Sequence, residues 1–228
     1  MSRLAIREVT TGARSDIIRG MSTIRITSTS QPFDTPDIAC QAIGVISKAD
    51  AMGLLENLEI QRLDLPSFRA VIGRIAEAGI GTEIQAALSV PGSRIGTSQM
   101  SRLLDRLSVA IDESPSPEHE WRALEGVFGT ARLAGLLGTS VPSVRRYLSG
   151  ARRTPDSLAA RLHFLATLVG DLAGAYNELG IRRWFERPRS LLDGKAPADL
   201  LRDDWDAEAS GPQRLRELAR SLTASPAT

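Results

Sequence analysis

The sequence predicts an all-α protein, and both its composition and its apolar pattern support this. Hydrophobic residues make up 42% of the 228 residues, but aromatic residues only 4%. A core must therefore be built mainly from Leu, Ile, Val and Ala, which favours helices over a β-sandwich. Apolar residues also recur at helical spacing along most of the chain after Gln31. We expect a helical N-terminal unit, then a helix-turn-helix, then a small helical C-terminal domain.

The N-terminal part is expected to be an arm followed by a helical domain. Residues 1–31 mix Arg, Ser, Thr and Gly without sustained periodicity, which indicates a flexible arm. In residues 32–113, Pro36 suits the first turn of a helix, and amphipathic segments follow it. Its further helices are expected at about 49–58, 66–78, 82–88 and 98–111, with breaks at Gly79 and Gly81. Two roles remain open for this domain: dimerisation or ligand sensing, and a plain scaffold.

Few residues could perform catalysis or hold a metal. Cys40 is the single cysteine, which excludes an intramolecular disulfide, and its place on the apolar face of the first helix indicates a buried, inert thiol. Glu118, His119 and Glu120 are adjacent, so on a helix they point in different directions, and we interpret them as a solvated helix start. His163 lies beside an apolar stripe and is expected to be a core or boundary histidine. We expect no catalytic residue, no metal, no cofactor and no enzymatic activity.

The chain also lacks the marks of a membrane or secreted protein. No apolar run approaches the ~20 residues that a transmembrane helix needs. The first residues alternate Arg with apolar residues and contain no apolar segment typical of a secretory signal. We therefore expect a cytoplasmic protein without a membrane partner.

Basic residues concentrate in the middle of the chain. Residues 121–189 contain eleven Arg and five acidic residues, a local charge of +6, although the whole chain carries only +1. An isolated basic segment indicates contact with a polyanion such as nucleic acid. The alternative is that the chain simply prefers Arg as its basic residue.

Within this basic segment, residues 130–149 have the pattern of two short helices joined by a tight turn. Two helices that pack at a steep angle need a small residue where they approach and a residue that tolerates positive φ in the turn, and Ala134 and Gly138 suit these places. Ser140 is a candidate N-cap, and Pro142 follows it in the first turn of the second helix. The apolar residues expected to share a core are Leu133, Leu137, Val144 and Leu148.

The other face of the second helix is polar and predicts contact with DNA. Arginine can pair with guanine in the major groove, and serine can meet bases or phosphates. The candidate DNA-binding residues are Ser140, Ser143, Arg145, Arg146, Ser149, Arg152 and Arg153. The alternative is an ordinary helical hairpin with solvated arginines. The segment resembles a helix-turn-helix of the Xre kind, and we place that domain at residues 118–180.

A second signature follows in residues 181–228. Trp184 is followed by the steps Pro188-x-x-Leu-Leu and Pro197-Ala-Asp-Leu-Leu. In this order, after an Xre-like helix-turn-helix, these residues resemble the Xre/MbcA/ParS-type antitoxin family of RES-Xre toxin-antitoxin systems. The resemblance covers about residues 118–222. A connection at residues 203–211 is longer and more acidic than the family's pattern.

This resemblance implies a toxin-binding domain at residues 181–228. Family members block a RES-domain toxin, an enzyme that consumes NAD, by placing the C-terminal segment at the toxin's active site. The residues that the resemblance and the apolar pattern mark for this contact are Trp184, Pro188, Leu191, Leu192, Pro197, Asp199, Leu200, Leu201, Arg214, Leu215, Arg216, Leu218 and Arg220. Part of the apolar set is also expected to pack on the preceding helix.

The function expected from the sequence is therefore that of an antitoxin which blocks a RES-domain toxin and represses its own operon. Its partners would be the toxin and operator DNA, and a homodimer or larger complex would place two reading helices one DNA turn apart. The alternative is a stand-alone helix-turn-helix transcription regulator whose N-terminal domain senses a ligand or dimerises.

Overall fold

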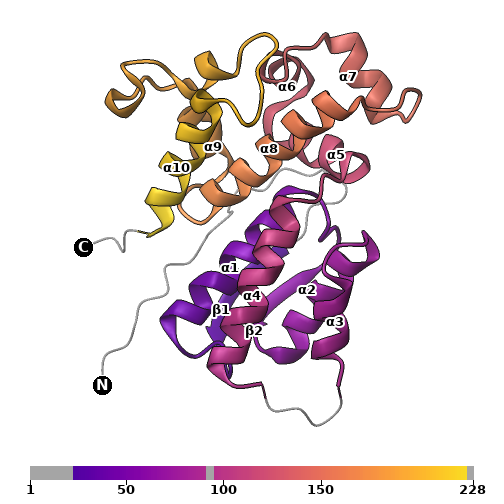
Figure 1. The fold of residues 1–228 in the computed structure, drawn as a ribbon, viewed down its shortest axis with the longest axis vertical. Coiled ribbons are helices and arrows are strands. Elements are labelled where there is room, and N and C mark those ends of the chain that lie inside the picture. The colour runs from indigo at the N-terminus through magenta and orange to yellow at the C-terminus, as the bar shows by residue number, and fades with distance from the viewer. Residues whose placement is uncertain (1–22, 91–94, 225–228) are drawn as a thin grey trace. The chain divides into compact units, whose positions relative to one another are not determined.

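The computed structural model describes residues 23–90 and 95–224, and over these residues it confirms the all-α prediction. Helices dominate, and the described residues contain a single sheet of two strands (Figure 1). The chain forms two compact units. The N-terminal unit comprises the described residues up to 46 and residues 54–111, and the C-terminal unit comprises residues 47–53 and those from 112 onward.

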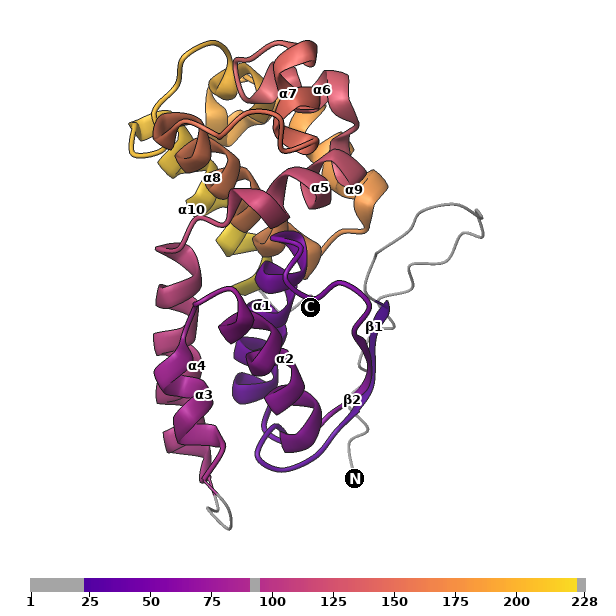
Figure 2. The same ribbon diagram turned by 90° about the vertical axis from the view of Figure 1, so that its right-hand side faces the viewer.

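The N-terminal unit combines a short parallel sheet with helices. Strands β1 (Thr23–Thr29) and β2 (Glu59–Leu63) pair in parallel, and α1 (Pro36–Ala51) connects them. Helices α1 and α2 lie on one side of the two strands (Figure 2). The remaining elements are α2 (Leu65–Glu77), α3 (Thr82–Leu88) and α4 (Thr97–Asp112).

Two secondary-structure expectations for this unit were wrong. Of the expected flexible arm, residues 1–22 lie outside the described residues, but residues 23–29 form β1. Ile24 and Ile26 are partly buried while Arg25 and Thr27 are exposed. An alternation this short does not predict a β-strand unless the distant partner strand is known. The helix expected at 49–58 is absent because α1 ends at Ala51 and β2 begins at Glu59.

The other helices of the unit follow the sequence pattern closely. Asp64 caps α2, where its Oδ1 accepts a hydrogen bond of 2.9 Å from the Ser67 amide. That bond lowers the pKa of the Asp64 carboxyl, because it stabilises the charged form. Gly79 and Gly81 have positive φ and separate α2 from α3, as expected. Cys40 is exposed, not buried, so the prediction of a buried thiol was wrong.

The C-terminal unit is organised around one buried helix. It contains the following elements: α5 (Pro117–Phe128), α6 (Thr130–Leu136), α7 (Val141–Leu148), α8 (Asp156–Ala173), α9 (Glu178–Glu186), the 3-10 turns η1 (Ser190–Leu192) and η2 (Pro197–Leu201), and α10 (Ser210–Ala224). Every residue from Leu162 to Gly170 of α8 is buried, and α5 and α10 both pack against this helix.

The boundaries of this unit differ from those expected. The helix-turn-helix at 118–180 and the segment 181–228 were expected to be separate domains, but the described residues of both belong to one unit. Residues 47–53, the end of α1 and the turn after it, belong to the same unit. A Cβ on Gly170 of α8 would lie 2.6 Å from the Cα of Lys48, so glycine is required where these two backbones meet. Such contacts between distant segments leave no periodic signal in the sequence.

Candidate functional site

The turn between α6 and α7 has the predicted chemistry. Gly138 has a φ of 63°, and a Cβ there would lie 1.9 Å from the backbone oxygen of Asp203. Glycine is thus needed both for the backbone conformation and for the close approach of another segment. Ser140 is the N-cap of α7, and its hydroxyl accepts a hydrogen bond of 3.3 Å from the Ser143 amide.

The apolar residues of the helix pair face the interior as predicted. Leu133, Leu137 and Val144 are fully buried, and Ala134 is nearly so. Leu148 is half-buried. The spacing therefore identified the inner face of the two helices correctly, and it leaves the opposite face of α7 to solvent.

That outer face brings the candidate DNA-binding residues together. Arg145, Arg146 and Ser149 of α7 and its C-cap are exposed, and Arg152 and Arg153 follow on the next loop, also exposed. Among the described residues neither Arg145 nor Arg146 forms an ion pair with an acidic side chain, and the Arg153 guanidinium approaches Asp156 only at 3.9 Å. The positive charge of this surface is therefore available to a polyanion.

A packed aromatic cluster lies beneath this surface, and sequence reasoning did not identify it. The rings of Trp121 on α5 and Tyr147 on α7 stack at 5.0 Å with an interplanar angle of 12°. Trp121 Nε1 donates a hydrogen bond of 2.9 Å to Thr154 Oγ1, and the guanidinium carbon of Arg152 lies 5.6 Å from the Tyr147 ring centroid. In a chain with few aromatic residues, one aromatic residue before the helix pair and one on its second helix were the available signal.

The acidic connection after η2 also supports the turn. Trp205 is buried, and its Nε1 donates a hydrogen bond of 2.8 Å to the Leu136 carbonyl oxygen. Arg161 of α8 donates to the Leu137 carbonyl oxygen at 3.3 Å and also pairs with Asp204. The residues that lengthen the C-terminal segment thus pack against the turn that precedes α7.

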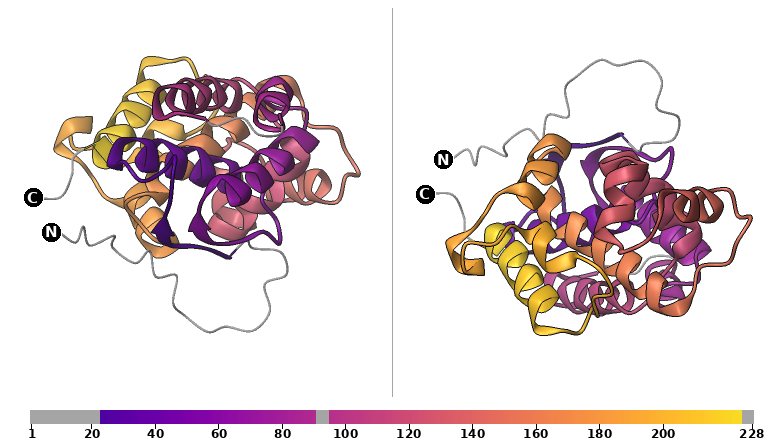
Figure 3. Two further views of the ribbon diagram at one scale, coloured as in Figure 1. Left: turned by 90° about the horizontal axis from the view of Figure 1, so that it is seen from below. Right: turned by 90° about the horizontal axis from the view of Figure 1, so that it is seen from above.

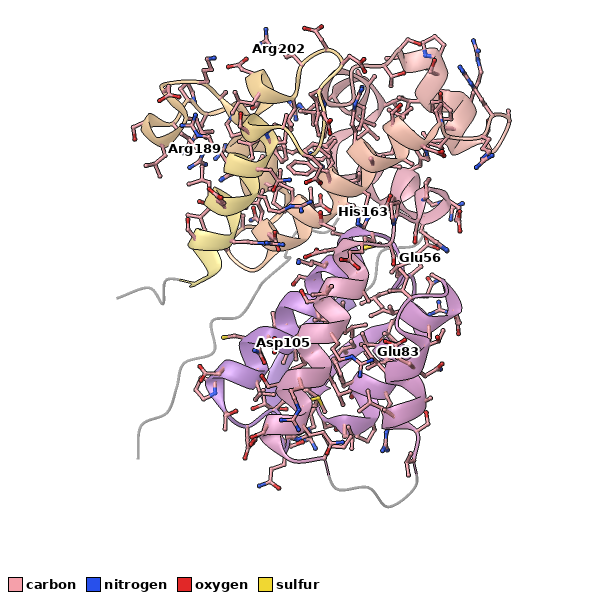
Figure 4. The ribbon with its side chains drawn as sticks, in the orientation of Figure 1. Glu56, Glu83, Asp105, His163, Arg189 and Arg202 are labelled. Atoms are coloured by element: carbon pink, nitrogen blue, oxygen red, sulfur yellow. The ribbon has the colours of Figure 1, made fainter. Side chains whose placement is uncertain are left out.

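A buried ionisable pair joins α5 to α8. Glu120 is fully buried, so the expectation of a solvated helix start was wrong for this residue. His163 on α8 (Figure 4) places Nδ1 2.6 Å from Glu120 Oε1 and Nε2 2.9 Å from the Asp112 carbonyl oxygen. A carbonyl oxygen only accepts, so Nε2 carries a hydrogen, and one further proton lies between Nδ1 and Glu120. Glu120 occupies the same helical face as Leu124, which was the overlooked signal.

The residues marked for toxin contact divide into a buried and an exposed set. Trp184 is 1% exposed and Leu192 2%, and Leu201 and Leu215 are fully buried. These side chains belong to the core of the C-terminal unit and cannot touch a partner in this conformation. The same holds for Pro197, which is also buried. Those with exposed or half-exposed side chains are Pro188, Leu191, Asp199, Leu200, Arg214, Arg216, Leu218 and Arg220.

Three residues of the exposed set, Leu191, Arg214 and Leu218, line a shallow hollow of about 240 Å³ between η1 and α10. Leu191 is 69% exposed, unusual for a large apolar side chain, and stands at its edge. The lining consists of Leu191, Leu192, Arg214, Glu217, Leu218 and Ser221. Three of the six lining residues are leucines and three are polar, a mixed surface of the kind on which another protein can dock.

The arginines of α10 hold the helix to its own unit. Arg214 pairs with Asp193 at 3.0 Å and donates to the Leu191 carbonyl oxygen at 2.7 Å. The guanidinium carbon of Arg216 lies 4.9 Å from the centroid of the Phe164 ring. Arg220 pairs with Asp112 at 2.9 Å. These contacts stabilise α10 on the unit, which sequence reasoning did not anticipate.

Arg220 belongs to a partly buried network of charges. Lys48 Nζ lies 2.8 Å from Asp112 Oδ1 and 3.5 Å from Asp171 Oδ1, and Arg220 Nε lies 3.4 Å from Asp171 Oδ2. Burial raises the pKa of the Asp171 carboxyl, although Lys48 and Arg220 oppose this effect. The network joins the end of α1, the end of α4, α8 and α10 within the C-terminal unit.

Helices α7 and α10 lie at opposite ends of the C-terminal unit, with α8 running between them (Figures 1 and 3). Within the described residues no cluster of three or more His, Cys, Asp or Glu could hold a metal ion. No single helix there is long and apolar enough to cross a membrane. The sharply bent pair α8 and α9 has the length and composition of a membrane span only when the two helices are taken together.

No protein-family model, curated protein or solved structure matches this chain.

Proposed function

We propose that this protein is a cytoplasmic DNA-binding antitoxin. In this proposal α7 reads operator DNA, the surface beside α10 binds and blocks a RES-domain toxin that consumes NAD, and the protein represses its own operon. Its activity is binding, not catalysis. The observation that carries the proposal is the exposed face of α7, where Arg145 and Arg146 have no acidic partner among the described residues.

The DNA-binding half of the proposal rests on geometry and charge. A capped helix whose inner face is apolar and whose outer face is arginine and serine fits the major groove. Arg152 and Arg153 stand at the end of this helix, where they would meet phosphates. One chain reads only half of a symmetric operator, so repression calls for two chains or a larger toxin complex.

The toxin-binding half rests on the resemblance of residues 181–228 to antitoxins and on the hollow beside α10. Because Trp184, Leu192, Leu201 and Leu215 are core residues, the contact surface narrows to the outer side of η1 and α10. Leu191 is its most exposed apolar residue. We therefore expect recognition through apolar packing at Leu191 and the half-buried Leu218.

The packing of α10 favours one alternative, a stand-alone transcription regulator. Leu215 and Ala219 of α10 are fully buried, and Arg214 and Arg220 are engaged within the chain. A C-terminal helix with such contacts can also serve only to stabilise a DNA-binding domain, without binding a toxin.

Operator binding is tested with the double substitution Arg145→Ala and Arg146→Ala, with a duplex from the region upstream of the gene as the probe. Two arginine contacts to bases are worth ~1–3 kcal/mol each, so affinity should fall at least 30-fold. The matched control changes Arg183 and Arg187, two exposed arginines on and after α9, to alanine and should keep its affinity. Unchanged binding by the first variant would refute the DNA-binding assignment.

Toxin binding is tested by co-expression with a RES-domain protein encoded beside this gene. Leu191→Asp places a charge in the hollow without disturbing the core, so it should release toxin activity and prevent co-elution on size exclusion, while DNA binding persists. Leu179→Asp, which changes another exposed leucine, on α9 and outside the marked set, is the matched control. Absence of any RES-domain neighbour, or full neutralisation by the Leu191 variant, would favour the stand-alone regulator.

A further inference from the structure

The loop after α7 is held at two points by the same residue of α5. Before the loop, the Tyr147 ring stacks on Trp121 at 5.0 Å. After it, Thr154 Oγ1 accepts a hydrogen bond of 2.9 Å from Trp121 Nε1. Trp121 is 3% exposed and Tyr147 8%, so this clamp is protected from solvent. The loop between the two points consists of residues 149–153, and Gly150 turns it with a φ of 70°.

The loop carries Arg152, and the clamp also orients this side chain. Its guanidinium carbon lies 5.6 Å from the Tyr147 ring centroid, within the range of a cation–π contact. Arg152 is nevertheless exposed, so its donors remain accessible. The side chain of its neighbour Arg153 is 93% exposed, contacts no aromatic ring among the described residues and approaches Asp156 only at 3.9 Å.

We propose that Trp121 and Thr154 are positioning residues that hold Arg152 as a phosphate anchor beside the reading helix α7. Neither residue is expected to touch DNA. An arginine fixed in advance loses less conformational entropy on binding than a free one, so its phosphate contact is stronger. This inference rests on the proposed DNA-binding function and deepens it.

The test measures binding of a 30-base-pair random-sequence duplex by fluorescence anisotropy at several salt concentrations. Each phosphate contact adds ~0.9 to the slope of log affinity against log salt, which is about eightfold in affinity at 0.1 M salt. Arg152→Ala should lose this contribution. Trp121→Phe keeps a ring for the stack but removes the Nε1 donor, and Thr154→Val removes the acceptor. Each should lose about half of that contribution on the logarithmic scale, about threefold.

Double substitutions separate positioning from a general effect on folding. Trp121→Phe combined with Arg152→Ala should bind no more weakly than Arg152→Ala alone, because both remove the same contact. When Trp121→Phe is instead combined with Arg153→Ala, the two losses of affinity should add. Thr154→Ser keeps the hydroxyl and should restore wild-type binding. Thermal melting of the Thr154 variants, which alter only the loop, checks that the fold persists.

The outcomes distinguish this inference from the function on which it rests. If the wild-type chain does not bind duplex DNA, the proposed function fails and the inference fails with it. If the wild type binds and both Trp121→Phe and Thr154→Val keep its affinity and salt slope, only the positioning role is overturned. Additive losses with Arg152→Ala would likewise overturn it.

Discussion

Helices α7 and α10 of the C-terminal unit both carry arginines, and they differ in what those arginines contact. On α7, Arg145 and Arg146 point to solvent with no ion pair among the described residues. On α10, Arg214 and Arg220 bind carboxylates of their own unit. Arginine thus provides an exposed positive surface at one end of the unit and ion pairs that stabilise the unit at the other. Charge counted along the sequence does not separate these two uses.

The largest expected effect concerns the turn that supports α7. Gly138→Ala should destabilise the C-terminal unit by about 4 kcal/mol or more, because the new Cβ meets the Asp203 backbone oxygen at 1.9 Å and the φ is positive. Gly150→Ala is the matched control, since its φ is also positive but its surroundings are open. It should cost only ~1 kcal/mol. Urea unfolding measures both, and equal costs would contradict the importance of the Asp203 contact.

The next effect concerns the buried pair Glu120–His163, which joins α5 to α8. Glu120→Ala leaves His163 buried without its partner and should lower the unfolding free energy by ~3 kcal/mol. Replacing both residues with apolar ones of similar size, Glu120→Leu with His163→Phe, should recover much of this loss. Denaturant midpoints give the two values. A double variant no more stable than Glu120→Ala would argue against the loss of a buried hydrogen-bond partner as the cause.

The comparison of arginines is sharpened by a pair of single substitutions. Arg220→Ala removes a partner from the partly buried Asp112 and Asp171 and should lower the unfolding free energy by ~1–2 kcal/mol. Arg146→Ala on α7 should change it by less than ~0.5 kcal/mol, because no acidic side chain of the described residues pairs with that charge. Thermal melts at equal ionic strength measure both. Similar losses would remove the distinction between the two helices.

The smallest expected effect is the pH dependence contributed by Asp171. Its pKa in the folded protein is raised above 3.8, so the folded state binds a proton more readily than the unfolded chain. The contribution of this group to stability is therefore greatest below pH 3.8 and falls as pH rises through the raised pKa. Asp171→Asn removes this fall, so its stability relative to the wild type should improve as pH increases above 3.8. The measurement is the unfolding free energy of both proteins over that range. If burial did not raise the pKa of Asp171, the difference between variant and wild type would stay constant with pH.

The local pattern of the sequence was informative where one helix face meets the core. It gave the bounds of α3 and α7 closely, the glycine in the turn and the cap at Ser140. It was wrong at β1, where strand pairing with a distant segment outweighs local pattern, and at residues 49–58, most of which form the turn between α1 and β2. Glu120 was misjudged because a carboxylate reads as solvent-facing unless its partner, 43 residues away, is known.

The sequence by itself determined that the chain is mainly helical, that an amphipathic pair with a glycine turn occupies residues 130–149, and that its outer face is basic, because periodicity and turn chemistry act over a few residues. Only the tertiary structure decided that Trp184 and Leu215 are core residues, that the arginines of α10 fasten it in place, and that Trp121 holds the loop after α7. Burial and pairing of a side chain depend on which distant segments pack against it, and local sequence does not encode that choice.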